Sequence, residues 1–287
     1  MKRTRVCDLF GIRYPIIQGG MGGISSPELV AGVSNAGGLG LLSGLVQGEG
    51  LREQIKRTRE LTSHPFGVNV PLFLSRVGDL DGLLSVISQE AVPVVATAAG
   101  NPMPLVPRLK EMGFKVMHVV ASARAARRAE EAGADAVVAE GFEAGGLLGR
   151  DEVTTMALVP LVVDSVRVPV IAAGGIADAR GLAAALALGA EGVQIGTRFI
   201  ATVECSARQG HKDAILAAQD TDTEVVDIPF GQARLLKAEP QDEQGPTDLY
   251  SRYPAGQIAG VVREIKTVGE VIKELVQGYD RIVESLR

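Results

Sequence analysis

The stretch VPVIAAGGIADARGLAAALALGAEGVQIGTRF, residues 168–199, decides the fold of this chain. It opens with an aliphatic run, continues as ARGLAAALALGA with apolar residues at helical spacing, and returns to an aliphatic run. A glycine closes the helical pattern just before the second run, as is common at a helix C-terminus. The stretch therefore predicts a strand, a helix and a second strand, which is the repeating unit of a parallel α/β sheet.

The same unit recurs from residue 15 onward, with helical patterns such as ELVAGVSNAG and RAARRAEEAG between the aliphatic runs. Eight short, even alternations indicate an α/β fold of the TIM (β/α)8 barrel type, because a doubly wound sheet more often stops at roughly five or six strands. The eight predicted strands lie at 15–21, 39–44, 66–71, 92–100, 115–122, 135–141, 169–175 and 192–199.

We expect a single domain over residues 1–287, with the barrel at about 15–218. The following segment, about 219–257, is predicted to be a lid-like excursion, because its part 232–257 is polar and rich in Pro and Gly. Residues 258–287 carry apolar side chains at helical spacing and are predicted to form helices packed on the barrel.

Composition narrows the class of protein. The net charge of −5 argues against nucleic acid as a partner. The two cysteines, Cys7 and Cys205, are far apart and form no metal or redox motif, which favours a reducing compartment and no metal site. The N-terminus lacks the apolar stretch of a signal peptide, and no segment is long enough to span a membrane. We therefore expect a soluble cytoplasmic protein with no membrane partner.

Glycines gather where the predicted strands end, which is the functional rim of such barrels. They lie at 19–23, 145–146, 174–175 and 196. A single glycine often only terminates a strand, but four clusters on one rim favour a ligand that approaches the backbone. The clusters of the last two strands predict a phosphate site made of backbone N–H groups, with Thr197 as a hydroxyl donor.

Several polar residues on this rim have a structural and a functional interpretation. Asn69 stands between two valines in a strand and needs a partner, which a ligand can supply. Glu140 ends an aliphatic strand and is the better functional candidate, whereas Glu143 reads as a solvated loop acid. Ser122 caps the next helix, lines the site, or does both. Met21 taken alone is more typical of core packing.

Motifs along nearly the whole chain now identify a family. They include YPIIQGGM at 14–21, SNAGGLG at 34–40, FGVNV at 66–70, GADAVVAEGFEAGG at 133–146, the opening stretch, and AGQIAG at 255–260. The chain resembles the nitronate monooxygenase (2-nitropropane dioxygenase) family of FMN-dependent TIM barrels, which includes the enoyl-acyl-carrier-protein reductase II branch.

The resemblance implies FMN as the cofactor, which supplies the electron chemistry. The backbone at Gly20 and Met21 is expected to lie against the ring, and Gln257 to close the site. Asn69 is expected to form a hydrogen bond with the ring or the ribityl chain. The glycines at 174–175 and 196, after the last two predicted strands, are expected to bind the phosphate. The cofactor-binding residues implied in this way are Gly20, Met21, Asn69, Ser122, Glu140, Gly145, Gly146, Gly174, Gly175, Gly196, Thr197 and Gln257.

One position departs from the family pattern EGxEAGGHxG. Its histidine, the proposed base for nitroalkanes, is replaced here by Leu147, which cannot accept a proton. His118 is a weak candidate to substitute; it shares strand parity with Ser122 and is predicted to face the barrel interior as a core histidine. His64 lies on the opposite rim, and His211 is predicted to be a surface residue. No catalytic residue is therefore assigned from the sequence.

Four functions remain open. The first is FMN-dependent oxidation of alkyl nitronates with O₂, since nitronates are already deprotonated, with poor turnover of neutral nitroalkanes. The alternative is an NAD(P)H-dependent flavin reductase of the enoyl-acyl-carrier-protein reductase II or quinone reductase type. The third is a flavin-free isomerase or lyase with a phosphorylated ligand, and the fourth a flavin-binding protein without turnover. A small-molecule substrate is expected in the first two, and NAD(P)H and a homodimer are left open.

Overall fold

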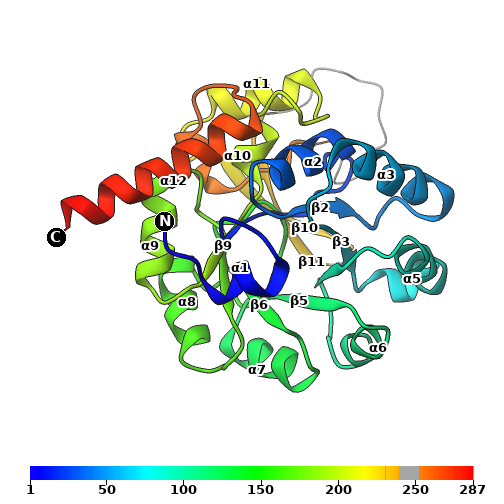
Figure 1. The fold of residues 1–287 in the computed structure, drawn as a ribbon. Helices are drawn as coiled ribbons and strands as arrows, with labels where there is room; N and C mark the ends of the chain where they lie inside the picture. Colours follow the sequence, from blue (N-terminus) through cyan, green and yellow to red (C-terminus); the bar gives the residue numbers. More distant parts are fainter. Residues whose placement is uncertain (230, 239–251, 287) are drawn as a thin grey trace.

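Eight parallel strands form the centre of the computed structural model, which describes residues 1–229, 231–238 and 252–286. They pair in the order β1-β9-β8-β6-β5-β4-β3-β2. A parallel bridge between Ile17 and Leu39 joins the first strand to the segment that opens the second, so that the sheet closes on itself. Helices surround it on the outside (Figure 1). The TIM barrel predicted from the sequence is confirmed.

Each predicted strand contains an observed one, which has the same bounds at 66–71 and shorter bounds elsewhere. Two runs were predicted too long, because Gly19, Gly20 and Met21 leave the first strand as a loop and Thr197–Ile200 forms the short helix α10. The barrel strands are β1 Ile16–Gln18, β2 Gly40–Ser43, β3 Phe66–Pro71, β4 Val94–Ala98, β5 Lys115–Val120, β6 Ala136–Glu140, β8 Val170–Ala173 and β9 Gly192–Ile195.

Four of the helices around the strands, α2, α5, α7 and α9, begin at a side-chain cap that the sequence supplies. Ser26 accepts a hydrogen bond from Leu29 N–H, and Asp178 caps its helix in the same way. The full set of these outer helices is α2 Pro27–Asn35, α3 Gly48–Leu61, α4 Leu74–Val77, α5 Leu80–Gln89, α6 Val106–Glu111, α7 Ala123–Glu131, α8 Thr155–Val163, α9 Ala179–Ala187 and α11 Gln209–Ala217.

The N-terminal end of the barrel is closed by helix α1, Arg5–Phe10. Its buried side chains Val6, Cys7 and Phe10 pack on inward-facing strand residues such as Leu41 and Met117. A second, larger apolar cluster lies between the strands and the outer helices. Because apolar side chains fill the interior at this end, a ligand cavity is left to the opposite, C-terminal end.

The C-terminal segment completes the ring of helices. It consists of a short 3-10 turn, η1 Gln257–Val261, and one long helix, α12 Val268–Ser285, rather than several packed helices. A capping box between Thr267 and Glu270 starts α12. This helix packs against α9 and α2, and so lies between the last and the first helices of the barrel (Figure 1).

The predicted lid-like excursion contains a regular element. Strands β10 Thr223–Ile228 and β11 Gly231–Leu236 form an antiparallel hairpin, and β11 also pairs with β7 Gly146–Leu148. Part of the predicted excursion is therefore a hairpin, and residues 230 and 239–251 of it lie outside the described residues. The loop after β6 is thus held as a strand by a segment far along the chain.

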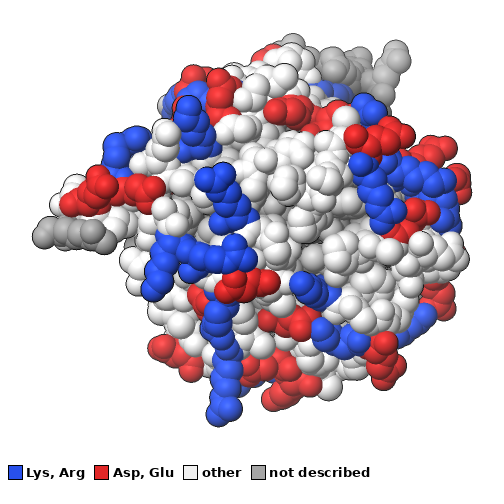
Figure 2. Space-filling view, in the orientation of Figure 1, with Lys and Arg blue, Asp and Glu red and all other residues white. Residues whose placement is uncertain are grey.

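Acidic and basic side chains are interspersed on the face shown in Figure 2, and this face carries no large area of one sign. In the described ranges, no helix combines the length and apolar character needed to cross a bilayer.

Candidate functional site

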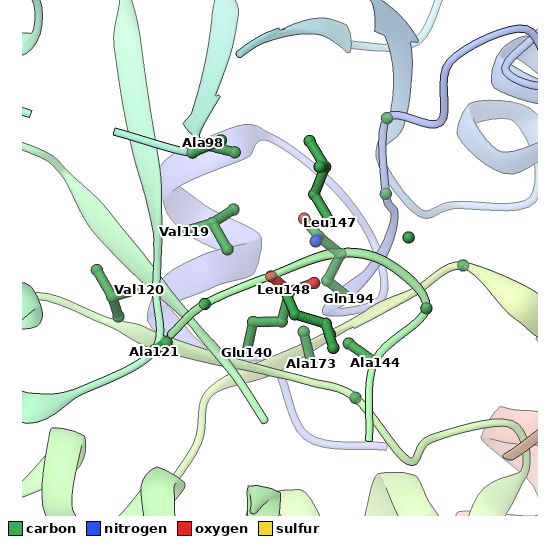
Figure 3. A pocket seen from close by; sticks show the side chains of 18 of the residues that line it. Ala98, Val119, Val120, Ala121, Glu140, Ala144, Leu147, Leu148, Ala173 and Gln194 are labelled. Carbon is green, nitrogen blue, oxygen red and sulfur yellow. The ribbon is translucent and has the colours of Figure 1, made fainter. Parts of the chain in front are cut away.

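A cavity of about 540 Å³ opens at the C-terminal ends of the strands. This volume is within the range of about 300–1,000 Å³ that is usual for small-molecule and cofactor sites. Its floor is the last inward-facing layer of barrel side chains, in which Glu140, Ala173 and Gln194 lie side by side in register (Figure 3). The floor includes Ser43, Asn69, Ala98, Glu140, Ala173 and Gln194.

Three polar side chains of this floor are unpaired within the described residues. The amides of Asn69 and Gln194 and the carboxyl of Glu140 form no hydrogen bond with any described residue. Polar groups withdrawn from bulk water are normally paired, so these three are left to solvent or a ligand. Asn69 and Glu140 were candidates from the sequence. Gln194 was not predicted from the sequence. Alternation along β9 could have found it, because Gln194 pairs with Ala173, which faces the barrel interior.

Glu140 lies where a charged carboxylate is disfavoured. Its neighbours in register and across the cavity include Ala173 and Leu148, which offer no hydrogen bond (Figure 3). Burial therefore raises the pKa of Glu140 to about 8. At neutral pH this side chain carries a proton, and it can donate or accept one within the range where enzymes work.

The glycine clusters after β8 and β9 come together at one edge of the cavity. Gly174 and Gly175 have φ values of +90° and +68°, which a residue with a side chain adopts only under strain. In the described part of the chain, the amide N–H groups of Gly174, Gly175, Gly196 and Thr197 donate no hydrogen bond. Thr197 Oγ1 accepts from Gly256 N–H at 2.9 Å, which leaves its hydroxyl hydrogen free to donate. These donors lie together at the place where the phosphate site was predicted.

The loop after β1 is held close to the floor. A Cβ atom on Gly20 would lie 2.3 Å from Asn69 Cβ, so the backbone there must be glycine. Behind it, Gln18 Nε2 donates to Ser25 Oγ at 2.9 Å, and Met21 N–H donates to the same oxygen at 2.8 Å. The fixed loop presents Gly20 and Met21 to the cavity, as expected.

Strand β7 forms one wall of the cavity, with Leu147 and Leu148 both bordering it (Figure 3). Gly145 and Gly146, which precede them, also border the cavity. A Cβ on Gly145 would lie only 2.4 Å from Ala255 C. Packing against the chain at Ala255 therefore requires a glycine at position 145. From the sequence, this glycine was expected because of a bound flavin.

An arginine on β11 anchors this wall and was not found from the sequence. Arg234 is buried, its Nη2 donates to Phe142 O at 3.0 Å, and its guanidinium lies 5.0 Å from the centre of the Phe142 ring. Burial lowers the pKa of Arg234, and the nearby Glu143 carboxylate opposes that change. Neither its position nor its partner follows from local sequence.

Two residues of the same region differ from expectation. Glu143 is not a solvated acid, because its carboxylate accepts from both the N–H and the Oγ1 of Thr155, each at 2.9 Å, at the start of α8. Gln257 donates its backbone N–H to Glu143 O at 3.0 Å, but its side chain is exposed and does not border the cavity. Ser122 does both things expected of it: it caps α7 by accepting from Ala125 N–H and it borders the cavity.

His118 was predicted to face the barrel interior, and this is wrong. Its neighbours Met117 and Val119 face inward, so His118 lies on the outer side of β5. Its Nδ1 lies 2.7 Å from Thr97 Oγ1, and burial lowers the pKa of His118 to about 4. The ring edges the cavity but is engaged with Thr97, as a structural histidine is.

His211 was predicted to be a surface residue and is instead buried. It stacks on Tyr253 with ring centres 4.9 Å apart, and its Nε2 lies 3.0 Å from Pro254 O. Burial lowers the pKa of His211 to about 4, so the ring stays neutral and donates to this carbonyl. The stack fixes the segment 253–256, which forms a wall of the cavity.

Across the described ranges, no group of three His, Cys, Asp or Glu side chains is close enough to hold a metal ion.

A family model, curated proteins and solved structures all show similarity to this chain. The sequence model of the nitronate monooxygenase family matches residues 3–245. A hydroxy-methyl-oxo-octahydroindene-carboxyl-CoA dehydrogenase from Rhodococcus jostii is 42% identical over 78% of this chain, and the match spans only 62% of that relative's length. A probable nitronate monooxygenase from Staphylococcus saprophyticus is 37% identical over 80% of this chain and 77% of its own. The structure of FabK from Thermotoga maritima is 44% identical with a TM-score of 0.91, covering 100% of this chain and 99% of that one.

Proposed function

This chain belongs to the nitronate monooxygenase family and is an oxidoreductase, and we propose that it binds FMN and acts on a thioester, with Glu140 as the group that donates or accepts the proton. Members of the family are in general flavoproteins. The observation that carries the proposal is the Glu140 carboxyl, which lies in the cavity and forms no hydrogen bond with a described residue.

The residues present fit FMN. Four backbone N–H groups without acceptors, at Gly174, Gly175, Gly196 and Thr197, suit the phosphate. The amides of Asn69 and Gln194 face the same cavity and can bond polar edges of the ring. Bound there, FMN would supply the two-electron chemistry, while the chain supplies orientation and proton transfer.

Glu140 provides the proton chemistry that Leu147 cannot. Reducing a carbon–carbon double bond beside a thioester adds a hydride to one carbon and a proton to the other. The protonated Glu140 carboxyl can donate that proton, and solvent can replace it through the cavity. In the reverse, dehydrogenating direction, the ionised carboxylate accepts the proton. One residue therefore serves either direction, with opposite dependence on pH.

The relatives support a thioester rather than another acceptor. The Rhodococcus relative is named for a carboxyl-CoA, which is a thioester. The family that the sequence resembles includes the enoyl-acyl-carrier-protein reductase II branch, whose substrates are also thioesters. The apolar side chains of Leu147 and Leu148 suit the hydrocarbon part of an acyl group.

An anaerobic flavin-reduction screen tests this function. The purified protein should release FMN on denaturation, and its flavin should bleach with NADPH or NADH, or with a saturated acyl-CoA. A reduced sample should reoxidise on adding an enoyl-CoA. If no thioester changes the flavin spectrum in either direction, the thioester assignment is wrong.

The variant Glu140→Gln tests the proton role. It should keep bound FMN but lose about 100-fold or more in kcat, because general acid–base groups contribute about 10²–10⁴-fold. In the wild type, kcat/KM for reduction should fall as pH rises through about 8, where Glu140 loses its proton. Glu131→Gln, an exposed charge neutralisation on α7, is the matched control. A Glu140→Gln variant with wild-type rates and pH profile would exclude the role.

Oxidation of alkyl nitronates with O₂ is the second candidate, favoured by the absence of a base at Leu147. A nitronate needs no proton removed, so the wild type should consume O₂ with nitronates and hardly with neutral nitroalkanes. Leu147→His should then gain activity on neutral nitroalkanes. Leu161→His, at an exposed leucine of α8 that does not border the cavity, should not. Equal activity of the wild type on both substrate forms would exclude this account.

A further inference from the structure

Three exposed arginines stand at the mouth of the cavity. Arg124, Arg128 and Arg150 border it and are exposed, and they form no ion pair or hydrogen bond with any described residue. Most arginines elsewhere are engaged, as in the pairs Arg52–Glu90 and Arg180–Asp178. Three free guanidinium groups at one opening indicate a site for an anion that the chain does not supply.

The fold directs these side chains to one place. Arg124 and Arg128 are four residues apart on α7 and therefore share a face. Helical side chains lean toward the helix N-terminus, which here lies at the rim of the barrel. A Cβ on Gly149 would lie 2.1 Å from Ala121 Cβ, so the chain before Arg150 runs directly against the residue before the α7 cap.

The acidic groups nearby do not neutralise this charge. Glu143 is occupied at the start of α8, and Glu140 is protonated at neutral pH. Asp151 borders the cavity and forms no ion pair with a described residue. The mouth therefore keeps an excess of positive charge.

The floor and the three arginines belong to the same cavity. Val120 pairs with Ala139, so β5 ends beside the strand that carries Glu140. A ligand that reacts at Glu140 and places its charge at the arginines therefore carries its phosphates apart from its reacting group.

We propose that Arg124, Arg128 and Arg150 bind the phosphates of an adenosine nucleotide that carries a diphosphate and an additional ribose phosphate. This rests on the proposed function, because the two co-substrates with that chemistry are a CoA thioester and NADPH. Guanidinium groups match phosphate in charge and in paired hydrogen-bond geometry. An acyl group on a phosphate-free arm lacks this contact.

Calorimetric titration with CoA, dephospho-CoA, pantetheine, NADP⁺ and NAD⁺ tests the subsite directly. The wild type should bind CoA or NADP⁺ more tightly than the partner that lacks the ribose phosphate. Arg124→Ala, Arg128→Ala and Arg150→Ala should each weaken that binding about three- to tenfold, since exposed contacts are screened by solvent. Arg127→Ala, an exposed arginine on another face of α7, is the matched control and should change nothing.

Kinetics then identify the source of the phosphates. A rise in KM for acyl-CoA but not for acyl-pantetheine in the three variants assigns the subsite to the CoA thioester. A rise for NADPH but not for NADH assigns it to the dinucleotide. The proposal is overturned if the variants bind and turn over every probe as the wild type does. It is also overturned if they lose affinity only for an acidic acyl-carrier protein.

The two proposals fail separately. If CoA binds through the arginines but no thioester reacts with the flavin, the subsite stands and the thioester function does not. If thioesters react equally well with or without phosphates, the function stands and the subsite does not.

Discussion

At the N-terminal end of the barrel, Phe10 of α1 packs on inward-facing apolar side chains such as Met117. At the C-terminal end, the same strands present Asn69, Glu140 and Gln194, whose side chains form no hydrogen bond with a described residue. One end buries apolar surface, which stabilises the fold. The other keeps polar groups that only solvent or a ligand can satisfy. Apolar packing at the closed end therefore stabilises the fold, and it offsets the cost of leaving polar groups of the open end to solvent or a ligand.

The largest expected effect comes from breaking the closed end. Phe10→Ala should lower the free energy of unfolding by about 3–5 kcal/mol, the cost of removing a buried aromatic side chain. Denaturant unfolding of the FMN-free protein measures it. The affinity for FMN should change less than about twofold. The half-buried Leu9→Ala is the control and should cost about 1 kcal/mol. A tenfold loss of FMN affinity in Phe10→Ala would show that the ends are not independent.

An intermediate effect is expected at the open end, where alanine should destabilise the protein by different amounts at two adjacent glycines. Gly145→Ala should cost about 2–3 kcal/mol, because its Cβ would meet the backbone of Ala255 at 2.4–2.7 Å. Gly146→Ala meets nothing within 4 Å, and only its φ of +75° is unfavourable, so it should cost about 1 kcal/mol. Thermal unfolding of both variants gives the comparison. Equal costs would mean that the contact between β7 and the 253–256 segment does not matter.

The smallest expected effect is a pH dependence of the free energy of unfolding that arises from Glu140 at the open end. Between about pH 4.5 and 8, Glu140 is ionised in the unfolded chain but protonated in the folded one. The folded state then binds more protons, so the free energy of unfolding falls as pH rises through this window. Because solvent reaches Glu140 through the cavity, Glu140→Gln should be more stable than the wild type by only about 1–2 kcal/mol above pH 8.

Well below pH 4.5, the two proteins should have the same stability, since Glu140 is then protonated in both states. Unfolding of both proteins along a pH series checks this difference, and other titrating groups cancel between them. A constant difference at every pH would mean that Glu140 has an ordinary pKa.

Much of the open end could be read from the sequence because its signals are local. The aliphatic runs set the strands, and the glycines at their ends marked the rim, so Gly174, Gly196 and Asn69 were predicted in the site. The error at His118 has a physical reason. β5 ends at Val120, and strand alternation cannot be counted from Ser122, which already belongs to the helix cap. Counting from Met117 gives the observed outer face.

The sequence by itself determined the eight-stranded barrel and the residues at the ends of its strands, because strand and helix periods and glycine positions act over a few neighbouring residues. Only the tertiary structure decided that Leu147 lies in a strand paired with Ala233, that His211 is buried against Tyr253, and that Gln257 points away. It also brought the arginines of α7 and Arg150 to one opening. Those outcomes depend on contacts between segments distant in the chain, where partners are set by packing and not by local preference.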